Sequence, residues 1–164
     1  MKRLGIAVTV LALGVAGCGG SNGGGTPTNP SAIRVFTVQL SAQNEVPAIT
    51  NAEAGARGTA VITFNTDANT VDFNVSLNSF PNDSVVRIAH IHGPASRTAT
   101  GGIVVDTSLT AGTVALVNGA GTFSFPGRSV TKALMDQILA SPDQFYFNVH
   151  TVLNGGGAVR GQLQ

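Results

Sequence analysis

Charged side chains are scarce in this sequence. Asp, Glu, Lys and Arg make up 10% of its 164 residues, and the formal net charge is +1. Lysine and arginine form no cluster, so the chain lacks the positive patch that attracts nucleic acid. Helical bundles also need many charged residues, whereas 21 glycines indicate many turns. The composition therefore excludes a nucleic-acid partner and favours a β protein.

Cysteine occurs once, as Cys18, which excludes an internal disulfide and a site of several thiolates. Lys2 and Arg3 precede an apolar run over residues 4–16. This run is too short to span a bilayer and has the length of a signal-peptide core. It ends in Val-Ala-Gly-Cys, which resembles a bacterial lipobox. The resemblance implies cleavage before Cys18 and lipidation of its sulfur, and Gly19 favours sorting to the outer membrane if the organism is Gram-negative.

The chain divides into three parts by composition. Residues 1–17 are expected to be a lipoprotein signal peptide. Residues 18–32 begin with the cysteine that is expected to be lipidated. They contain mostly Gly, Ser, Asn, Thr and Pro, which predicts a flexible tether. Residues 33–164 remain as one β domain, held at the cell envelope by its membrane anchor.

Alternating apolar and polar residues predict strands along most of this domain. Asn118-Gly119 and Asn154-Gly155 predict hairpin turns, because both residue types tolerate positive φ. An apolar stripe over residues 130–139 predicts one helix, capped by Ser129 or Thr131. The predicted strands cover residues 33–40, 59–64, 71–77, 85–92, 103–105, 113–117, 122–125, 145–151 and 158–163.

Short strands with hairpin turns and one short helix predict an all-β fold, an antiparallel Greek-key sandwich or barrel. The helix is expected to cover one end of the sheets. The core is expected to bury the following residues or their immediate neighbours: Val61, Phe64, Phe73, Val75, Leu77, Ile103, Val105, Phe123, Phe147 and Val149.

All three histidines lie in predicted strands. His90 and His92 project from the same face of one strand, because side chains alternate with a period of two. Tyr146, Asn148 and His150 share one face of the closing hairpin for the same reason. Three converging imidazoles would suit zinc or copper. We therefore expect a metal site at His90, His92 and His150, with Tyr146 and Asn148 around it.

The same spacing also fits histidines that only hydrogen-bond to neighbouring loops. Catalytic motifs are absent: no Gly-x-Ser-x-Gly elbow occurs, the eight acidic residues are scattered, and no phosphate-binding fingerprint is present. No catalytic residue is therefore predicted. Arg160 is expected to form a structural ion pair with Glu45, if the two ends of the domain lie side by side.

Five short motifs stand out in this domain: Leu40 with residues 44–47 (NEVP), then 89–93 (AHIHG), 102–105 (GIVV), 146–151 (YFNVHT) and 157–163 (GAVRGQL). Together they resemble the chordin-type, or CHRD, domain, and the match covers about residues 33–164. The resemblance implies an extracytoplasmic β domain, which occurs singly in bacterial secreted proteins and is repeated in chordin, an animal protein that binds growth factors. It implies no enzyme activity.

The histidine pattern is also similar to the copper-binding strand of copper/zinc superoxide dismutases, which are Greek-key β proteins. We thus expect a lipid-anchored binding module with copper or zinc as its candidate cofactor and an extracytoplasmic protein as a candidate partner. Two alternatives stay open. A structural or interaction module without metal would show an exposed apolar surface and melting that does not depend on metal. A copper-dependent redox enzyme would have to work without a bridging histidine or a second metal cluster.

Overall fold

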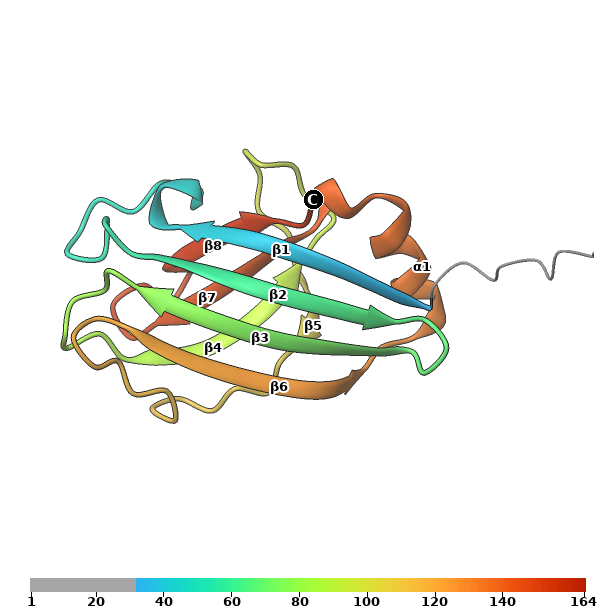
Figure 1. The fold of residues 1–164 in the computed structure, drawn as a ribbon. Helices are drawn as coiled ribbons and strands as arrows, with labels where there is room; N and C mark the ends of the chain where they lie inside the picture. Colours follow the sequence, from blue (N-terminus) through green and yellow to red (C-terminus); the bar gives the residue numbers. More distant parts are fainter. Residues whose placement is uncertain (1–31) are drawn as a thin grey trace, which may run out of the picture.

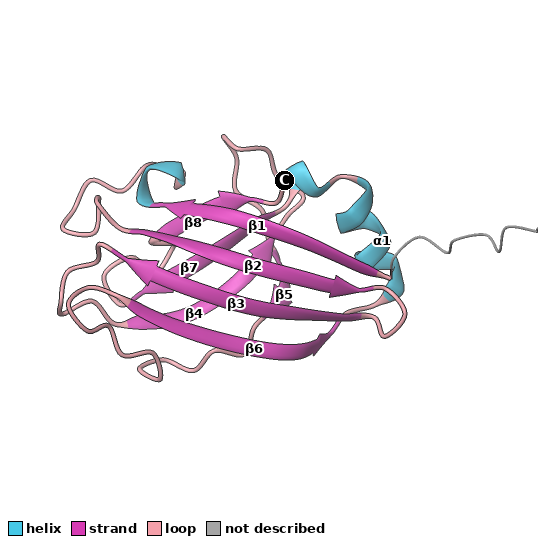
Figure 2. Cartoon of the chain, viewed as in Figure 1, coloured by secondary structure: helices cyan, strands magenta, loops and turns pink. Residues whose placement is uncertain are grey.

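A computed structural model describes residues 32–164 and confirms the all-β prediction. Strands make up most of the domain (Figure 2). They are accompanied by one α-helix and two short 3₁₀ segments. The strands are β1 (Ile33–Ser41), β2 (Arg57–Asn65), β3 (Thr70–Asn78), β4 (Val86–His92), β5 (Ile103–Asp106), β6 (Gly121–Ser129), β7 (Tyr146–Thr151) and β8 (Val159–Gln162). The helices are η1 (Ala42–Asn44), α1 (Lys132–Ala140) and η2 (Pro142–Gln144).

The predicted signal peptide, Cys18 and the tether up to residue 31 lie outside the described residues. Within residues 32–164, no helix has the length and apolar character needed to cross a membrane.

The strands form two layers that face each other (Figure 1). Their order is β5-β4-β7-β8-β1-β2-β3-β6, and every neighbouring pair is antiparallel. One layer holds β1, β2, β3 and β6, and the other holds β8, β7, β4 and β5. The layers join where Ser41 of β1 pairs with Arg160 of β8. Connections such as β3 to β4 cross between layers, as a Greek-key arrangement requires.

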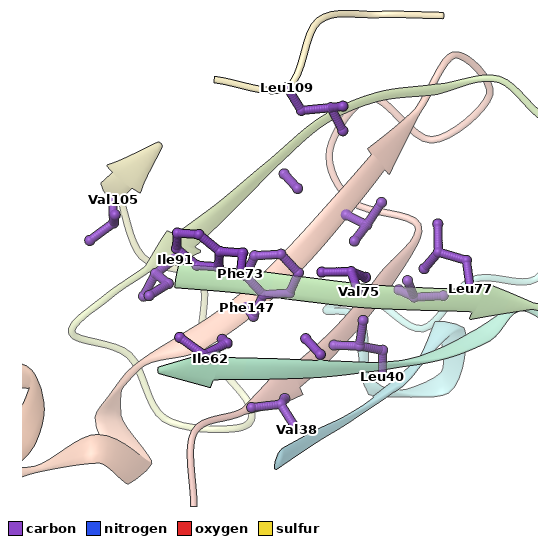
Figure 3. Packing of buried hydrophobic residues seen from close by; sticks show 14 of the residues in the cluster. Val38, Leu40, Ile62, Phe73, Val75, Leu77, Ile91, Val105, Leu109 and Phe147 are labelled. Atoms are coloured by element: carbon purple, nitrogen blue, oxygen red, sulfur yellow. The ribbon is translucent and has the colours of Figure 1, made fainter. Parts of the chain in front are cut away.

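The apolar faces of the two layers pack against each other (Figure 3). Phe73 of β3 stacks on Phe147 of β7, with ring centroids 5.5 Å apart. Most of the predicted core residues are buried, but Val61 and Phe123 are half-buried and Ile103 is exposed. Val61 points outward because its neighbour Ile62 occupies the inner face of β2.

The hairpin predicted for residues 113–117 and 122–125 is wrong. Asn118 and Gly119 do turn with positive φ, but the segment before them forms only one isolated bridge, between Val117 and Ala120. The strand after the turn, β6, pairs with the edge of β3 instead. The prediction for the closing hairpin is correct for its two strands but wrong for its turn. A longer loop joins β7 to β8, and the residue with positive φ in this loop is Gly157.

Helix α1 covers one end of the layers, near the start of β1 (Figures 1 and 2). Thr131 caps it, because its hydroxyl oxygen accepts a hydrogen bond from the amide of Leu134. Met135 and Ile138 provide its buried face. Of the two caps that the sequence allowed, Thr131 is therefore the one used.

Candidate metal site

The pairing of β4 with β7 brings the three histidines together. His90 lies opposite Asn148 in this ladder, and His92 lies opposite Tyr146. His150 is two residues beyond Asn148 and therefore projects from the same face. The ring centroids of the three imidazoles are 5.2 to 5.6 Å apart. The sequence predicted that the histidines project from one face of each of two strands. The structure places these two faces side by side across the β4–β7 pair.

One nitrogen of each ring faces the centre of the cluster. His90 Nδ1 lies 3.4 Å from His150 Nε2, and His92 Nε2 lies 3.4 Å from the same atom. All three nitrogens lie within 4.8 Å of one another. Two nitrogens bound to one tetrahedral zinc ion at about 2.05 Å would be about 3.3 to 3.4 Å apart. The two separations that involve His150 therefore match edges of a zinc coordination polyhedron.

The outer nitrogens have partners that fix the tautomers of two rings. His92 Nδ1 donates to the carbonyl oxygen of Gly101 at 3.1 Å, and His150 Nδ1 donates to that of Gly155 at 3.0 Å. A carbonyl oxygen can only accept, so in each neutral ring the proton is on Nδ1. The two Nε2 atoms then carry lone pairs that point at each other. His90 Nε2 lies 3.7 Å from the carboxylate of Asp106.

Burial favours the neutral form of all three histidines. It lowers the pKa of His92 to about 4, and the charges of the other two histidines and of Arg160 add to this effect, while the bond to Gly101 opposes it. Burial also lowers the pKa of His150 and of His90. For His90, the charge of Asp106 partly opposes this shift. Neutral imidazole is the form that binds metal, so the cluster is ready for a cation at neutral pH.

The polar face of β7 is buried. Every residue of this strand is buried, and the three histidines are at most 8% exposed. Part of the cover is the loop between β4 and β5, where the amide of Gly101 donates to the hydroxyl oxygen of Tyr146. Gly101 therefore bonds to His92 through its carbonyl and to Tyr146 through its amide, which holds the loop over the cluster.

Tyr146 lies against His92, with ring planes 6° apart and centroids separated by 5.0 Å. The guanidinium of Arg160 covers the other face of the tyrosine at 3.5 Å from its centroid. The result is a stack of His92, Tyr146 and Arg160, which restricts the orientation of the imidazole. Asn148 lies in the same row, but the hydrogen bond of its side chain goes to Glu45 rather than to a histidine.

The direct ion pair expected between Glu45 and Arg160 does not form. Among the described residues, neither side chain has an oppositely charged partner within 4.0 Å. Arg160 instead donates to the backbone carbonyls of Ala99 and Ser96, at 2.8 and 2.9 Å. The two charges still interact at longer range, since Arg160 opposes the rise in the pKa of Glu45 that burial causes. The guanidinium of Arg160 was expected to donate to a carboxylate, and it donates to backbone carbonyl oxygens instead.

Several residues of the site were not foreseen from the sequence. The outer nitrogens of the histidines contact Gly101, Gly155 and Asp106. The two glycine partners are backbone carbonyls, and no periodic pattern in the sequence predicts a loop carbonyl as a partner. Glu53 was also missed: it is fully buried and accepts hydrogen bonds from Ser84, Thr151 and Asn154. An acidic residue between two alanines was the only signal for it.

A family model described as CHRD domain matches residues 36–163, which is most of the chain. No curated protein matches, and neither does any solved structure.

Proposed function

The chain belongs to the CHRD domain family, and we propose that its domain is a metal-binding module of the cell envelope. In this proposal, His90 Nδ1, His92 Nε2 and His150 Nε2 hold one transition metal ion. Tyr146 and the carbonyls of Gly101 and Gly155 orient the ligands. Such outer partners fix the tautomer and ring position of metal-binding histidines in other proteins.

One observation carries the proposal. His92 Nε2 and His150 Nε2 are 3.4 Å apart, while the Nδ1 protons of both rings are committed to backbone carbonyls. Two buried lone pairs that face each other repel, because neither ring has a proton left for a hydrogen bond between them. A cation at the centre turns this repulsion into two bonds. Histidines that only fasten loops would not need inner nitrogens that converge.

Three imidazoles suit both zinc and copper, and a fourth position would be taken by water or another ligand. Divalent copper binds nitrogen sites more tightly than zinc in the general order of first-row metals. We therefore expect both ions to bind, copper with the higher affinity.

Calorimetric titration of the full chain with Zn²⁺ and then with Cu²⁺ tests the proposal. Wild type and the control Asp67→Asn, an exposed turn residue, should take up one ion each. His92→Ala should lose most of the heat, because the remaining pair of ligands binds weakly. Equal heats in wild type and His92→Ala would remove the site and favour the alternative, a structural or interaction module without metal.

We also propose that the domain is anchored by a lipid on Cys18. The lipobox-like sequence supports this location, and Gly19 supports the outer membrane in a Gram-negative cell. Fractionation of cells that express wild type or Cys18→Ala tests the anchor. The wild type should sediment with membranes and the variant should not, whereas membrane association of both would contradict lipidation at this residue.

A further inference from the structure

His90 differs from the other two histidines at its outer nitrogen. In His92 and His150 that nitrogen donates to a backbone carbonyl, which fixes the tautomer. The outer nitrogen of His90, Nε2, instead faces the carboxylate of Asp106 at 3.7 Å, a distance longer than that of a hydrogen bond. The position of the proton on the neutral His90 ring is therefore not set by a carbonyl partner, and two tautomers compete.

The two tautomers of His90 have opposite consequences for the cluster. With the proton on Nδ1, the ring can donate to His150 Nε2, which lies 3.4 Å away and carries a lone pair. The two histidines are then joined by a hydrogen bond, and a metal ion has to displace its proton. With the proton on Nε2, the lone pair of Nδ1 faces the Nε2 atoms of His92 and His150. Only this second tautomer offers three ligand atoms to a cation.

Asp106 is held in place beside His90. The two residues are partners in the β4–β5 ladder, so their side chains lie on the same face of neighbouring strands. The carboxylate oxygen that faces His90, Oδ1, also accepts a hydrogen bond of 2.7 Å from the amide of Ser108. Among the described residues, no other carboxylate lies within 4.0 Å of a histidine nitrogen. The position of this oxygen thus follows from the backbone of β5 and of the turn after it.

The carboxylate of Asp106 favours one of the two tautomers. An ionised carboxylate can only accept, so it stabilises the ring whose proton points towards it, which for His90 is the ring with the proton on Nε2. The charge of Asp106 also opposes the fall in the pKa of His90 that burial causes, as expected of an acceptor beside the ring. Because the Asp106 side chain is 61% exposed, water screens its charge, and the expected effect is moderate.

We propose that Asp106 is a positioning residue of the metal site, whose carboxylate keeps the proton of neutral His90 on Nε2 and leaves Nδ1 free for the ion. This role rests on the proposed function, whereas the tautomer is a property of the metal-free protein and can be measured without metal. Loss of a carboxylate that orients a metal-binding imidazole typically costs about 10-fold to 100-fold in metal affinity. The exposure of Asp106 places the expected loss at the lower end of this range.

Nitrogen-15 NMR of the metal-free full chain reads the tautomer directly. Long-range proton–nitrogen correlations at pH 8, with EDTA present, should show the His90 proton on Nε2 in wild type and in the control Asp67→Ala, an exposed turn residue. In Asp106→Ala the proton should lie on Nδ1 in much of the population. A wild-type ring with its proton on Nδ1, or the same tautomer in wild type and Asp106→Ala, would overturn the proposal.

Zinc affinity, measured by competition with a chelator, tests the consequence for the site. It should fall roughly tenfold in Asp106→Ala relative to wild type and Asp67→Ala. Asp106→Asn keeps an oxygen that can accept from the Ser108 amide but lacks the charge, so it separates the effect of the carboxylate from a shift of the turn. Its affinity should also fall, by less than in Asp106→Ala.

The two ways in which this experiment can fail are distinguishable. Wild-type zinc affinity in both Asp106 variants would overturn the role of Asp106 and leave the three-histidine site in place. A wild-type protein that binds no zinc would remove the metal site itself, and the role of Asp106 with it. Far-UV circular dichroism of each variant verifies that the fold is retained.

Discussion

Replacement of Glu45 by Gln is expected to stabilise the protein at neutral and alkaline pH but not in acid. Burial raises the pKa of Glu45 from 4.5 to about 7, and the charge of Arg160 and the Asn148 hydrogen bond oppose this rise only in part. Below pH 4.5 the carboxyl is protonated in both the folded and the unfolded protein. Between pH 4.5 and 7 the unfolded chain loses the proton first, so the free energy of unfolding falls as the pH rises.

The size of this effect follows from the two pKa values. Each pKa unit is worth about 1.4 kcal/mol, so the difference between 4.5 and about 7 amounts to about 3 kcal/mol as an upper value. Glutamine has no proton to lose and avoids the cost. The stability of Glu45→Gln relative to wild type should therefore grow between pH 4.5 and 7 and level off above that range.

Urea unfolding followed by far-UV circular dichroism measures the difference, since the chain has no tryptophan to report on its fold. Wild type, Glu45→Gln and Asp67→Asn are compared from pH 4 to 8 in the presence of a chelator. Asp67→Asn should follow wild type. A gain in Glu45→Gln that is constant over this range, or one that grows toward acid, would refute the reasoning about burial.

Three further results are expected. Zinc binding should persist well below pH 6.5 in a pH series of titrations, because burial lowers the pKa of all three histidines, and loss of binding already at pH 6.5 would contradict this. Glu53→Ala should lower the free energy of unfolding by about 3 kcal/mol in urea, since three donors lose their shared acceptor; a change below about 1 kcal/mol would mean that water replaces the carboxylate. Tyr146→Phe keeps the ring against His92 but removes the acceptor of the Gly101 amide, so zinc affinity should fall roughly tenfold in a chelator competition, and unchanged affinity would separate Tyr146 from the site.

The faces of the strands could be predicted from the sequence because alternation is a local property of extended backbone. His90 and His92 on one strand, and Asn148 and His150 on another, project as their spacing requires. The pairing of these two strands could not be derived in the same way, since the segments between them carry no signal for which strands become neighbours. That step depended on the assumption that the polar faces meet.

The errors have a common physical origin in irregular backbone. Arg160 finds its partners in the carbonyls of Ser96 and Ala99, and the outer nitrogen of His92 finds Gly101, all within one loop. Every residue carries a carbonyl, so sequence alone cannot show which of them a side chain will reach. The segment 113–117 alternates like a strand, but β6 takes the free edge of β3, and alternation does not reveal which edges are open.

The most direct test of the metal site is a crystal structure of zinc-soaked protein, with anomalous diffraction recorded on both sides of the zinc absorption edge. We expect one zinc peak at about 2.0 to 2.1 Å from His90 Nδ1, His92 Nε2 and His150 Nε2. The bonds from the outer nitrogens of His92 and His150 to Gly101 and Gly155 should be retained. No peak at this position, or a zinc ion that leaves His150 unbound, would contradict the proposed three-histidine site.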